Sequence, residues 1–218
     1  MELKGLKINF LGDSITEGVG VSSKDALYHA VLKRDAELAE TRNYGISGTR
    51  FALQHNKTND YVDVNSFSER FAQMDDDADA VVVFGGTNDY GHGDADIGCF
   101  TDRTPDTFYG ACHYLFSGLI KKYLGKPVVI MTPLHRTFET EIPECKAEGD
   151  YGILVEYVDI IREVAEYYSL PVLDLFATSG MQPEIEEIKE TYIPDGLHPN
   201  DAGQAVIAHK LRRFLEQL

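Results

Sequence analysis

Five short apolar segments recur along the chain, and they restrict its fold more than any other feature of the sequence. They are Lys7–Leu11, Arg42–Ile46, Ala80–Phe84, Pro127–Met131 and Pro171–Leu175. At least three of them are near-continuous runs of β-branched or aliphatic residues. Such runs are typical of strands that helices cover on both faces, whereas a half-exposed strand alternates between apolar and polar residues. We therefore predict five strands inside a layered fold.

Helical stretches are predicted between these segments. They are Ala26–Ala39, Ser66–Met74, Thr107–Tyr123, Tyr151–Tyr168 and Asp201–Leu218. Alternating strands and helices imply parallel strands joined by right-handed crossovers, so the predicted fold class is α/β, a three-layer α/β/α sandwich around a central five-stranded parallel sheet. No repeat, low-complexity segment or linker marks a second domain, and we expect residues 1–218 to form a single domain.

Two connections are long for such a fold, one from about residue 87 to 106 and the other from about 132 to 150. Both follow a predicted strand and therefore leave its carboxyl end, where open parallel sheets bind their ligands. Long connections without secondary structure tend to be functional. We expect these two to form the walls of a substrate pocket.

The chain carries 36 acidic and 20 basic residues, a formal net charge of −16. A protein that tracks nucleic-acid phosphates requires a basic face, so we expect no nucleic-acid partner. The same negative field repels anionic membranes and polyanionic substrates at long range. The acidic run at residues 75–79 is interpreted as a solvated turn before the third strand.

The cysteines and the apolar pattern bear on where the protein resides. Cys99, Cys112 and Cys145 cannot all pair with one another and lack the close CxxC spacing of zinc or redox sites, so we expect reduced thiols. No stretch approaches the ~20 apolar residues of a membrane span, and the N-terminal sequence lacks the pattern of a signal peptide. These features predict a cytoplasmic protein with no membrane partner.

A possible nucleophile follows the first strand in the segment GDSIT, residues 12–16. A serine at this strand-to-helix turn is exposed at the top of the sheet, and its own N–H faces an opening that accepts an anion. In isolation the segment is equally typical of a turn and helix cap. A phosphate-binding turn is less favoured, because no GxxxxGK[ST] pattern occurs.

A possible base lies near the last predicted helix, in the segment DGLHPN, residues 195–200. A serine hydroxyl needs a base in contact with it, and histidine suits this role. The spacing lets Asp195 reach Nδ1 of His198 and leaves Nε2 for the serine. Pro199 keeps His198 out of the helix, which Asn200 or Asp201 can cap. In isolation this segment is also compatible with a capped loop.

Two further segments follow strands and offer hydrogen-bond donors. In GGTND, residues 85–89, the amide of Asn88 can donate to an oxyanion, and in NYGISGT, residues 43–49, Gly48 can offer its backbone N–H. Each segment alone is better explained as a loop start or a turn glycine with positive φ. Together the four segments supply a nucleophile, oxyanion donors, a base and its orienting carboxylate at one edge of the sheet.

With these four segments in this order, the sequence resembles the SGNH, or GDSL-type, esterase/lipase family of acylhydrolases. The matching residues are Ser14 in GDSIT, Gly48 in NYGISGT, Asn88 in GGTND, and Asp195 and His198 in DGLHPN. The match spans nearly the whole chain, and Ile15 stands where the family's name has leucine. The resemblance implies a flavodoxin-like three-layer fold and ester hydrolysis by a serine nucleophile. It implies no metal or organic cofactor.

The mechanism that follows as a hypothesis is acyl transfer. Ser14 attacks the ester carbonyl, His198 takes the proton, and Asp195 orients His198. The backbone N–H groups of Ser14 and Gly48 and the amide of Asn88 form the oxyanion hole. An acyl-enzyme forms and is then hydrolysed.

The substrate is indicated by candidate pocket residues in and near the two long connections. These substrate-binding candidates are Asp13, Tyr90, His92, His135 and Arg136. Aromatic and hydrogen-bonding groups suit short-acyl, mainly acetyl, esters of carbohydrates or similar polar alcohols better than long acyl chains. For each residue alone, ordinary loop packing explains its type at least as well. A metal site at His92, Asp94 and Asp96 is rejected, because the run fits neither the EF-hand nor the HExxH pattern.

Other functions remain open at this point. A lysophospholipase or thioesterase of the same family is one, and a non-catalytic carbohydrate-binding module on the same fold is another. That module would be expected to lack part of the triad. A flavodoxin-like nucleotide or flavin binder would need a phosphate-cradling loop, yet no GxGxxG follows the first strand. The face of Tyr151–Tyr168 suits a dimer and packing on the sheet equally well.

Overall fold

Five parallel strands form one sheet in the order β2-β1-β3-β4-β5. The computed structural model describes residues 1–55, 65–146 and 149–218. The strands are β1 (Lys7–Gly12), β2 (Glu40–Gly45), β3 (Ala80–Phe84), β4 (Val128–Met131) and β5 (Val172–Leu173). This is the strand order of flavodoxin-like folds, and the predicted all-parallel α/β architecture is confirmed.

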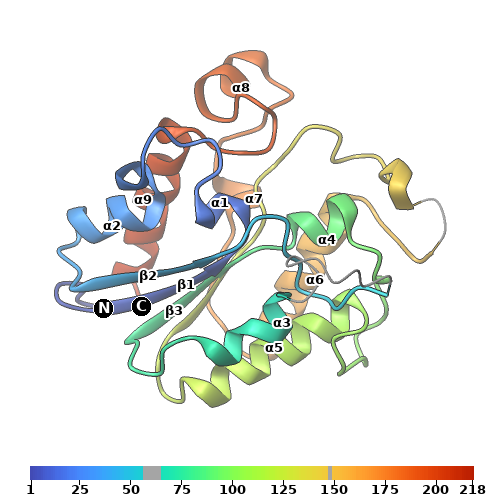
Figure 1. Cartoon of the computed structure of the whole chain (residues 1–218), viewed down its shortest axis with the longest axis horizontal. Coiled ribbons are helices and arrows are strands. Elements are labelled where there is room, and N and C mark those ends of the chain that lie inside the picture. Colours follow the sequence, from blue (N-terminus) through green and yellow to red (C-terminus); the bar gives the residue numbers. More distant parts are fainter. Residues whose placement is uncertain (56–64, 147–148) are drawn as a thin grey trace.

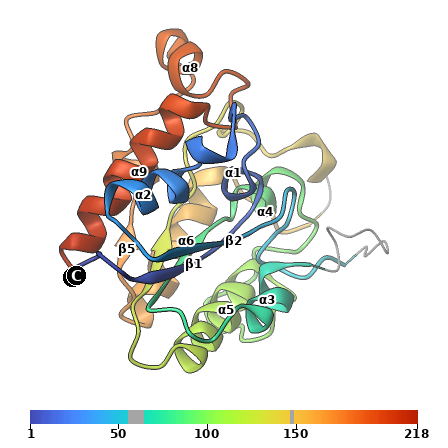
Figure 2. The same ribbon diagram turned by 60° about the vertical axis from the view of Figure 1, so that its left-hand side comes forward.

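Helices cover both faces of the sheet. They are α1 (Ser14–Glu17), α2 (Tyr28–Asp35), α3 (Phe67–Arg70), α4 (Thr87–His92), α5 (Phe108–Lys122), α6 (Leu154–Tyr167), α7 (Leu175–Thr178), α8 (Glu186–Tyr192) and α9 (Asp201–Glu216), with 3₁₀ turns η1 (Lys24–Ala26), η2 (Phe71–Gln73) and η3 (Glu144–Lys146). Figure 1 shows α2 and α9 on one side of the sheet and α3, α5 and α6 on the other. Figure 2 shows the same two layers on either side of β1 and β2.

The central strand β3 explains why the apolar runs are continuous. All five of its residues are buried. Val81 and Val83 pack into the core under α5 and α6, while Val82 and Phe84 pack into the core under α2 and α9. Because both faces are dry, neither set of alternate positions is polar. Each such side chain contributes about 1.5–3 kcal/mol by burial.

Side-chain caps fix several helix starts. Ser66 caps α3 in a capping box with Glu69, and Thr107 caps α5 by accepting the N–H of Gly110. Asn200 caps α9, as expected, by accepting the N–H groups of Ala202 and Gly203. These caps satisfy donors that the first helical turn leaves unpaired.

The predicted elements need correction at four places. The connection 87–106 begins with a helix, α4, and β5 has only two residues where five were expected. The strand ends early because the carboxylate of Asp174 accepts the N–H of Ala177 and starts α7. Helix α2 is also shorter than predicted, since residues 24–26 form a separate 3₁₀ turn. Helix α8 was not predicted, because it is short and none of its residues is buried; only Ile188 and Tyr192 pack, partly buried, against the core.

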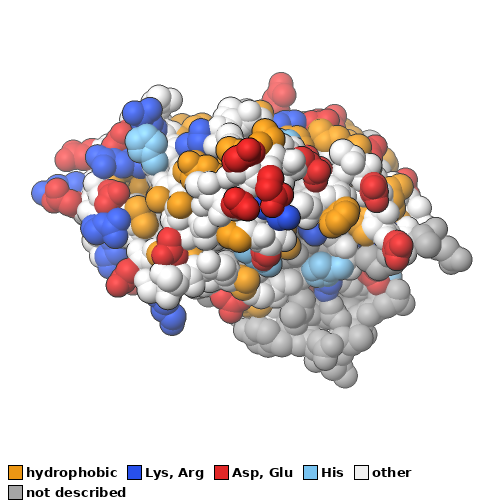
Figure 3. Space-filling view, turned by 90° about the horizontal axis from the view of Figure 1, so that it is seen from above, with side chains coloured by type: hydrophobic (Ala, Val, Ile, Leu, Met, Phe, Trp, Pro, Cys, Tyr) orange, Lys and Arg blue, Asp and Glu red, His pale blue; other side chains and the backbone are white. Residues whose placement is uncertain are grey.

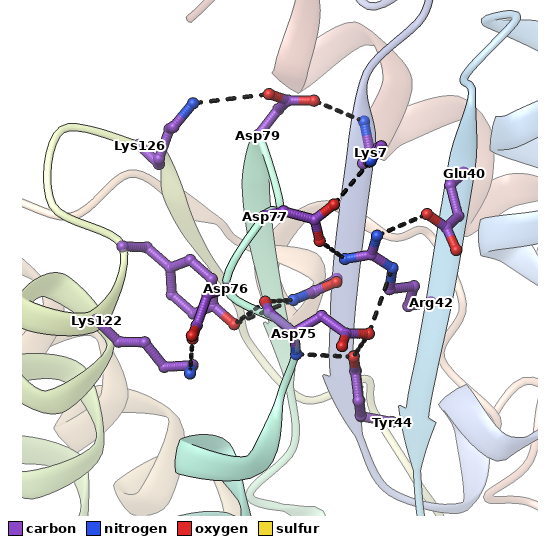
Figure 4. A network of polar contacts seen from close by, with 12 residues as sticks. Lys7, Glu40, Arg42, Tyr44, Asp75, Asp76, Asp77, Asp79, Lys122 and Lys126 are labelled. Atoms are coloured by element: carbon purple, nitrogen blue, oxygen red, sulfur yellow. Dashed lines mark hydrogen bonds and ion pairs between the residues drawn. The ribbon is translucent and has the colours of Figure 1, made fainter.

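The acidic run, residues 75–79, forms an exposed turn before β3, as predicted, and basic side chains surround it (Figure 4). The ion pairs are Lys7–Asp77, Arg42–Asp75, Arg42–Asp77, Lys122–Asp76 and Lys126–Asp79, with Arg42 also bound to Glu40. These contacts join the start of β3 to β1, β2 and the end of α5.

Two further findings concern the described residues. No helix among them is long and apolar enough to cross a membrane. Cys99 is an exposed free thiol and Cys112 a buried one. The side chain of Cys145 lies outside the described part of the structure, so its predicted state is untested.

Candidate active site

Ser14 stands where β1 turns into α1. The preceding Asp13 is buried and caps this helix, its Oδ1 accepting the N–H of Ile15 at 3.0 Å. Burial raises the pKa of Asp13 to about 6, although the hydrogen bond from Ile15 opposes this. Gly12 is required here, since a Cβ at this position would lie 1.9 Å from Oγ1 of Thr16. Asp13, one of the predicted substrate contacts, therefore shapes the turn that presents Ser14.

His198 meets Ser14 across 184 residues of sequence. Its Nε2 lies 3.0 Å from Oγ of Ser14, and its Nδ1 lies 2.6 Å from Oδ2 of Asp195. Since a carboxylate only accepts, Nδ1 carries the hydrogen and Nε2 can accept from the serine hydroxyl. The structure thus joins these three residues in the order that their spacing predicts.

Asp195 is held by the backbone as well as by the imidazole. Its Oδ1 accepts the N–H groups of Leu197 at 2.9 Å and of His198 at 2.7 Å. Partial burial would raise the pKa of Asp195, but the hydrogen bonds from His198 and Leu197 outweigh it and lower the pKa below its usual value. The group therefore stays anionic and fixes the imidazole orientation.

The loop after α1 holds His198 in place. Gly20 has a φ of +91°, and a Cβ there would lie 3.2 Å from Cβ of His198 and 3.1 Å from the carbonyl oxygen of Pro199. The backbone N–H of Ser22 donates to Asp201 at 2.8 Å. These contacts bind the nucleophile loop to the start of α9.

Backbone and amide donors lie in the predicted oxyanion segments. Gly48 adopts a φ of 75°, as predicted for a turn glycine. Within the described residues, the N–H groups of Ser14 and Gly48 have no acceptor. Asn88 is buried, and its Nδ2 donates to the carbonyl of Thr49 at 3.1 Å. One of the two amide hydrogens is then left for a ligand.

Arg70 lies behind these donors and is a residue that the sequence reasoning missed. It is 5% exposed. Its guanidinium donates to the carbonyl of Gly12 at 2.7 Å, to Oγ1 of Thr49 at 2.9 Å and to the carbonyl of Tyr44. It also lies 4.5 Å above the ring of Phe67. The sequence could have indicated this role, because Arg70 shares one face of the predicted helix with the apolar Phe67, Phe71 and Met74.

Asp89 is a second missed residue. It is 3% exposed, and its carboxylate accepts the N–H of Phe51 at 2.9 Å and of Ala52 at 3.0 Å. Burial raises the pKa of Asp89 to about 6, although these two hydrogen bonds oppose it. Asp89 thereby ties the helix that carries Asn88 to the segment that carries Gly48.

A cavity of about 330 Å³ lies between α4 and residues 136–144, so both long connections line it. Tyr90 and Arg136 are on its wall, with the guanidinium 5.4 Å from the ring centre. The Tyr90 hydroxyl donates to the carbonyl of Glu141 at 2.8 Å. Phe138 and Ile142 also line the cavity and are exposed. Two of the five predicted substrate contacts therefore reach this cavity.

The two remaining candidates are engaged by other residues. Nδ1 of His135 lies 2.7 Å from Oε1 of Glu139, and its ring centre lies 3.9 Å from that of Phe176 with the two rings tilted by 34°. His92 contacts Asn88 through Nε2 and Arg50 through Nδ1. In the described part of the chain, no three His, Cys, Asp or Glu side chains converge as metal ligands.

The surface around the site carries mixed side chains. Figure 3 views the molecule from above, the side on which α8 lies in Figure 1. Acidic and hydrophobic side chains are interspersed over its middle, whereas Lys and Arg gather toward the side of α2 and α9. An uncharged ligand would meet little electrostatic opposition on such a face.

Comparison with known proteins gives a family match over most of the chain. Residues 10–206 match the model of the GDSL-like lipase/acylhydrolase family. A protein of known structure from Lactobacillus plantarum is 30% identical, with a TM-score of 0.82 and 98% of each chain covered. Among curated proteins, none matches the sequence.

More distant structures share the fold. A lipase/acylhydrolase from Enterococcus faecalis is 21% identical, with a TM-score of 0.63, covering 97% of this chain and 96% of that one. A two-domain esterase active on acetylated mannans is 20% identical, with a TM-score of 0.65, covering 98% of this chain and 49% of that one.

Proposed function

Because this chain belongs to the GDSL-like lipase/acylhydrolase family, we propose that it is a serine esterase that hydrolyses carboxylic esters through an acyl-enzyme. One observation carries the proposal: Ser14, His198 and Asp195 are joined by contacts of 3.0 and 2.6 Å. A serine hydroxyl becomes nucleophilic only with such a base, and the base needs a carboxylate to fix its tautomer.

Acylation begins when Oγ of Ser14 attacks the ester carbonyl and Nε2 of His198 accepts the hydroxyl proton. Asp195 stabilises the imidazolium that forms. The carbonyl oxygen becomes an oxyanion, which the free N–H groups of Ser14 and Gly48 and the second amide hydrogen of Asn88 can bind.

Release of the alcohol completes acylation, and deacylation by water follows. The tetrahedral intermediate collapses, the bond to the alcohol oxygen breaks, and the His198 imidazolium protonates the leaving alcohol. Water then enters, gives a proton to His198 and attacks the acyl-enzyme. The carboxylic acid leaves as Oγ of Ser14 regains its proton.

The preferred substrates in this proposal are acetyl or other short-acyl esters of carbohydrates or similar polar alcohols. The modest cavity and its guanidinium support a polar substrate, whereas the hydroxyl hydrogen of Tyr90 is already donated to the backbone. The fold shared with an esterase active on acetylated mannans is consistent with this.

A second candidate is a lysophospholipase or thioesterase. It is favoured by the exposed Phe138 and Ile142, whose side chains are 75% and 51% exposed beside the same cavity. Apolar groups at a cavity mouth suit a longer acyl chain.

Hydrolysis of p-nitrophenyl esters from acetyl to octanoyl, together with acetylated sugars, tests the proposal. We expect the rate to fall steeply beyond propionyl, and a rate that rises toward octanoyl would favour the second candidate. Ser14→Ala should abolish turnover and labelling by a fluorophosphonate, while Ser117→Ala, on α5, should retain both. Full activity in Ser14→Ala would refute the proposal, and a wild-type protein that reacts with neither probe would indicate a binding module.

A further inference from the structure

Four residues beside the oxyanion segments form one continuous line of hydrogen bonds. Asn88 donates from Nδ2 to the carbonyl of Thr49 at 3.1 Å. Its Oδ1 lies 3.1 Å from Nε2 of His92, whose Nδ1 lies 2.9 Å from Nη1 of Arg50. The two outer members, Thr49 and Arg50, directly follow Gly48 in the chain.

The two outer groups of this line, the Thr49 carbonyl and the Arg50 guanidinium, determine which atoms of Asn88 and His92 donate and which accept. A backbone carbonyl can only accept, so the amide nitrogen of Asn88 must face Thr49 and its oxygen must face His92. A guanidinium can only donate, so Nδ1 of His92 must accept from Arg50. His92 is then neutral and carries its hydrogen on Nε2, which donates to Asn88.

The reversed orientation of Asn88 is excluded by the same logic. It would bring Oδ1 against the carbonyl oxygen of Thr49, two acceptors with no hydrogen between them. It would also turn the amide hydrogens toward His92 and away from the position that the oxyanion occupies.

The surroundings of His92 keep it uncharged. His92 is an exposed residue, but the protein around its ring still desolvates it, and this desolvation, together with the positive charges of Arg50, Arg136 and Lys146, lowers the pKa of His92 to about 4. Its ring therefore differs from that of His198, whose hydrogen lies on Nδ1 and whose Nε2 accepts.

We infer that His92 is a positioning residue, which holds the amide of Asn88 in the orientation that donates to the oxyanion, with Arg50 fixing the tautomer of His92. This inference rests on the proposed esterase function. It replaces the expectation that His92 contacts the substrate, because both ring nitrogens are already used.

The tautomer can be measured directly in the wild-type protein. In ¹⁵N-histidine spectra at neutral pH, we expect the His92 imidazole to be neutral with its hydrogen on Nε2, and its signal to be identified by its disappearance in His92→Gln. A charged ring, or a neutral ring with hydrogen on Nδ1, would overturn the inference whatever the activity of the protein.

Kinetics of three variants at this position separate positioning from substrate binding. Glutamine can donate to Asn88 and accept from Arg50, so His92→Gln should keep kcat within about fivefold of wild type. His92→Glu cannot donate to Oδ1 and instead attracts the amide hydrogens. We expect its kcat to fall about 10²-fold, as on loss of one oxyanion donor, with KM little changed.

His92→Leu should behave like His92→Glu, which shows that the loss does not come from the added charge. His209→Leu, on the exposed face of α9, is the matched control and should keep the wild-type kcat. A rise in KM at constant kcat in the Glu and Leu variants, or wild-type kinetics in both, would overturn the inference.

The two proposals fail differently. A wild-type protein that hydrolyses none of the esters refutes the proposed function, and the positioning role falls with it. An active wild type whose His92→Glu variant is equally active refutes the positioning role alone.

Discussion

Arg70 and Arg42 each tie neighbouring strands together, but at different ends of the sheet. Arg70 is 5% exposed and donates to backbone carbonyls at the carboxyl ends of β1 and β2. Arg42, within β2, pairs with the carboxylates of Glu40 and Asp77 toward the amino end (Figure 4). Those two partner side chains are 43% and 58% exposed.

The contrast shows where polar contacts determine the structure. When Arg42 is removed, water can solvate the carboxylates that it leaves. When Arg70 is removed, the carbonyls of Gly12 and Tyr44 each lose a charged donor at a buried position, although the carbonyl of Gly12 still accepts the N–H of Ile46. The edge of the sheet that carries the candidate active site is therefore held by a buried charged donor, whereas the opposite end is held by pairs whose carboxylates remain exposed.

Replacing each arginine by methionine tests this contrast, and the larger effect is expected at Arg70. Arg70→Met should destabilise the fold by about 3–5 kcal/mol, because it removes three buried hydrogen bonds from a charged donor, to the carbonyls of Gly12 and Tyr44 and to Oγ1 of Thr49. Urea unfolding followed by circular dichroism measures the change. A loss below about 1 kcal/mol, no larger than that expected of an exposed pair, would remove the distinction between the two ends.

The oxyanion donor provides the next largest effect. Asn88→Ala should lower kcat about 10²–10³-fold, since one transition-state hydrogen bond is lost. KM for p-nitrophenyl acetate should change little. Unfolding curves control for stability, and an unchanged kcat in a folded variant would place the oxyanion elsewhere.

Buried and exposed carboxylates should also respond oppositely to pH. Asp89 has a pKa of about 6 in the folded state, above its unfolded value. The stability that it contributes is therefore complete below about pH 4 and is lost as pH rises to about 6. Asparagine does not titrate, so Asp89→Asn removes this pH-dependent loss. The free energy of unfolding of the variant, measured relative to wild type, should therefore rise by up to about 3 kcal/mol between pH 4 and 6.5.

Asp77→Asn is the matched variant at the amino end. Hydrogen bonds from Arg42 and Lys7 lower the pKa of Asp77, so the stability that Asp77 contributes is present above its unfolded pKa and is lost only at lower pH. Its difference from wild type should stay constant from pH 5 to 6.5. Parallel pH dependences for the two variants would contradict the assignment.

The smallest effect is expected from Arg42→Met. The variant should lose much less stability than Arg70→Met, because the exposed carboxylates around residues 75–79 can be solvated, and added salt should reduce the loss further. Ester hydrolysis should be unchanged. A large loss of stability that persists at high salt would show that this network matters to the fold.

Much of the fold was predictable because buried strands and helix faces are made of apolar residues, and these recur at regular positions in the sequence. The run at β3 is apolar at every position because both of its faces are covered. Helix α4 was missed because its sequence, TNDYGH, has poor helix formers. The helix is stabilised by a tertiary contact, in which its own Asp89 accepts the N–H groups of Phe51 and Ala52. Such tertiary contacts have no local pattern.

The candidate site was predictable where chemistry and spacing coincide. The spacing of Asp195 and His198 implied their contact, and the motif at Ser14 implied the partner of His198. The supporting residues were not predictable in this way. The role of His92 depends on which atoms of Asn88 and Arg50 lie beside it, which residue types alone do not specify.

The separation of Ser14 from His198 by 184 positions has a consequence for biosynthesis. The ribosome adds the base 184 residues after the nucleophile. A nascent chain still lacking residues 195–198 therefore carries an unactivated serine. We expect acyl transfer to become possible only after this last segment has left the exit tunnel and docked against the first strand's turn.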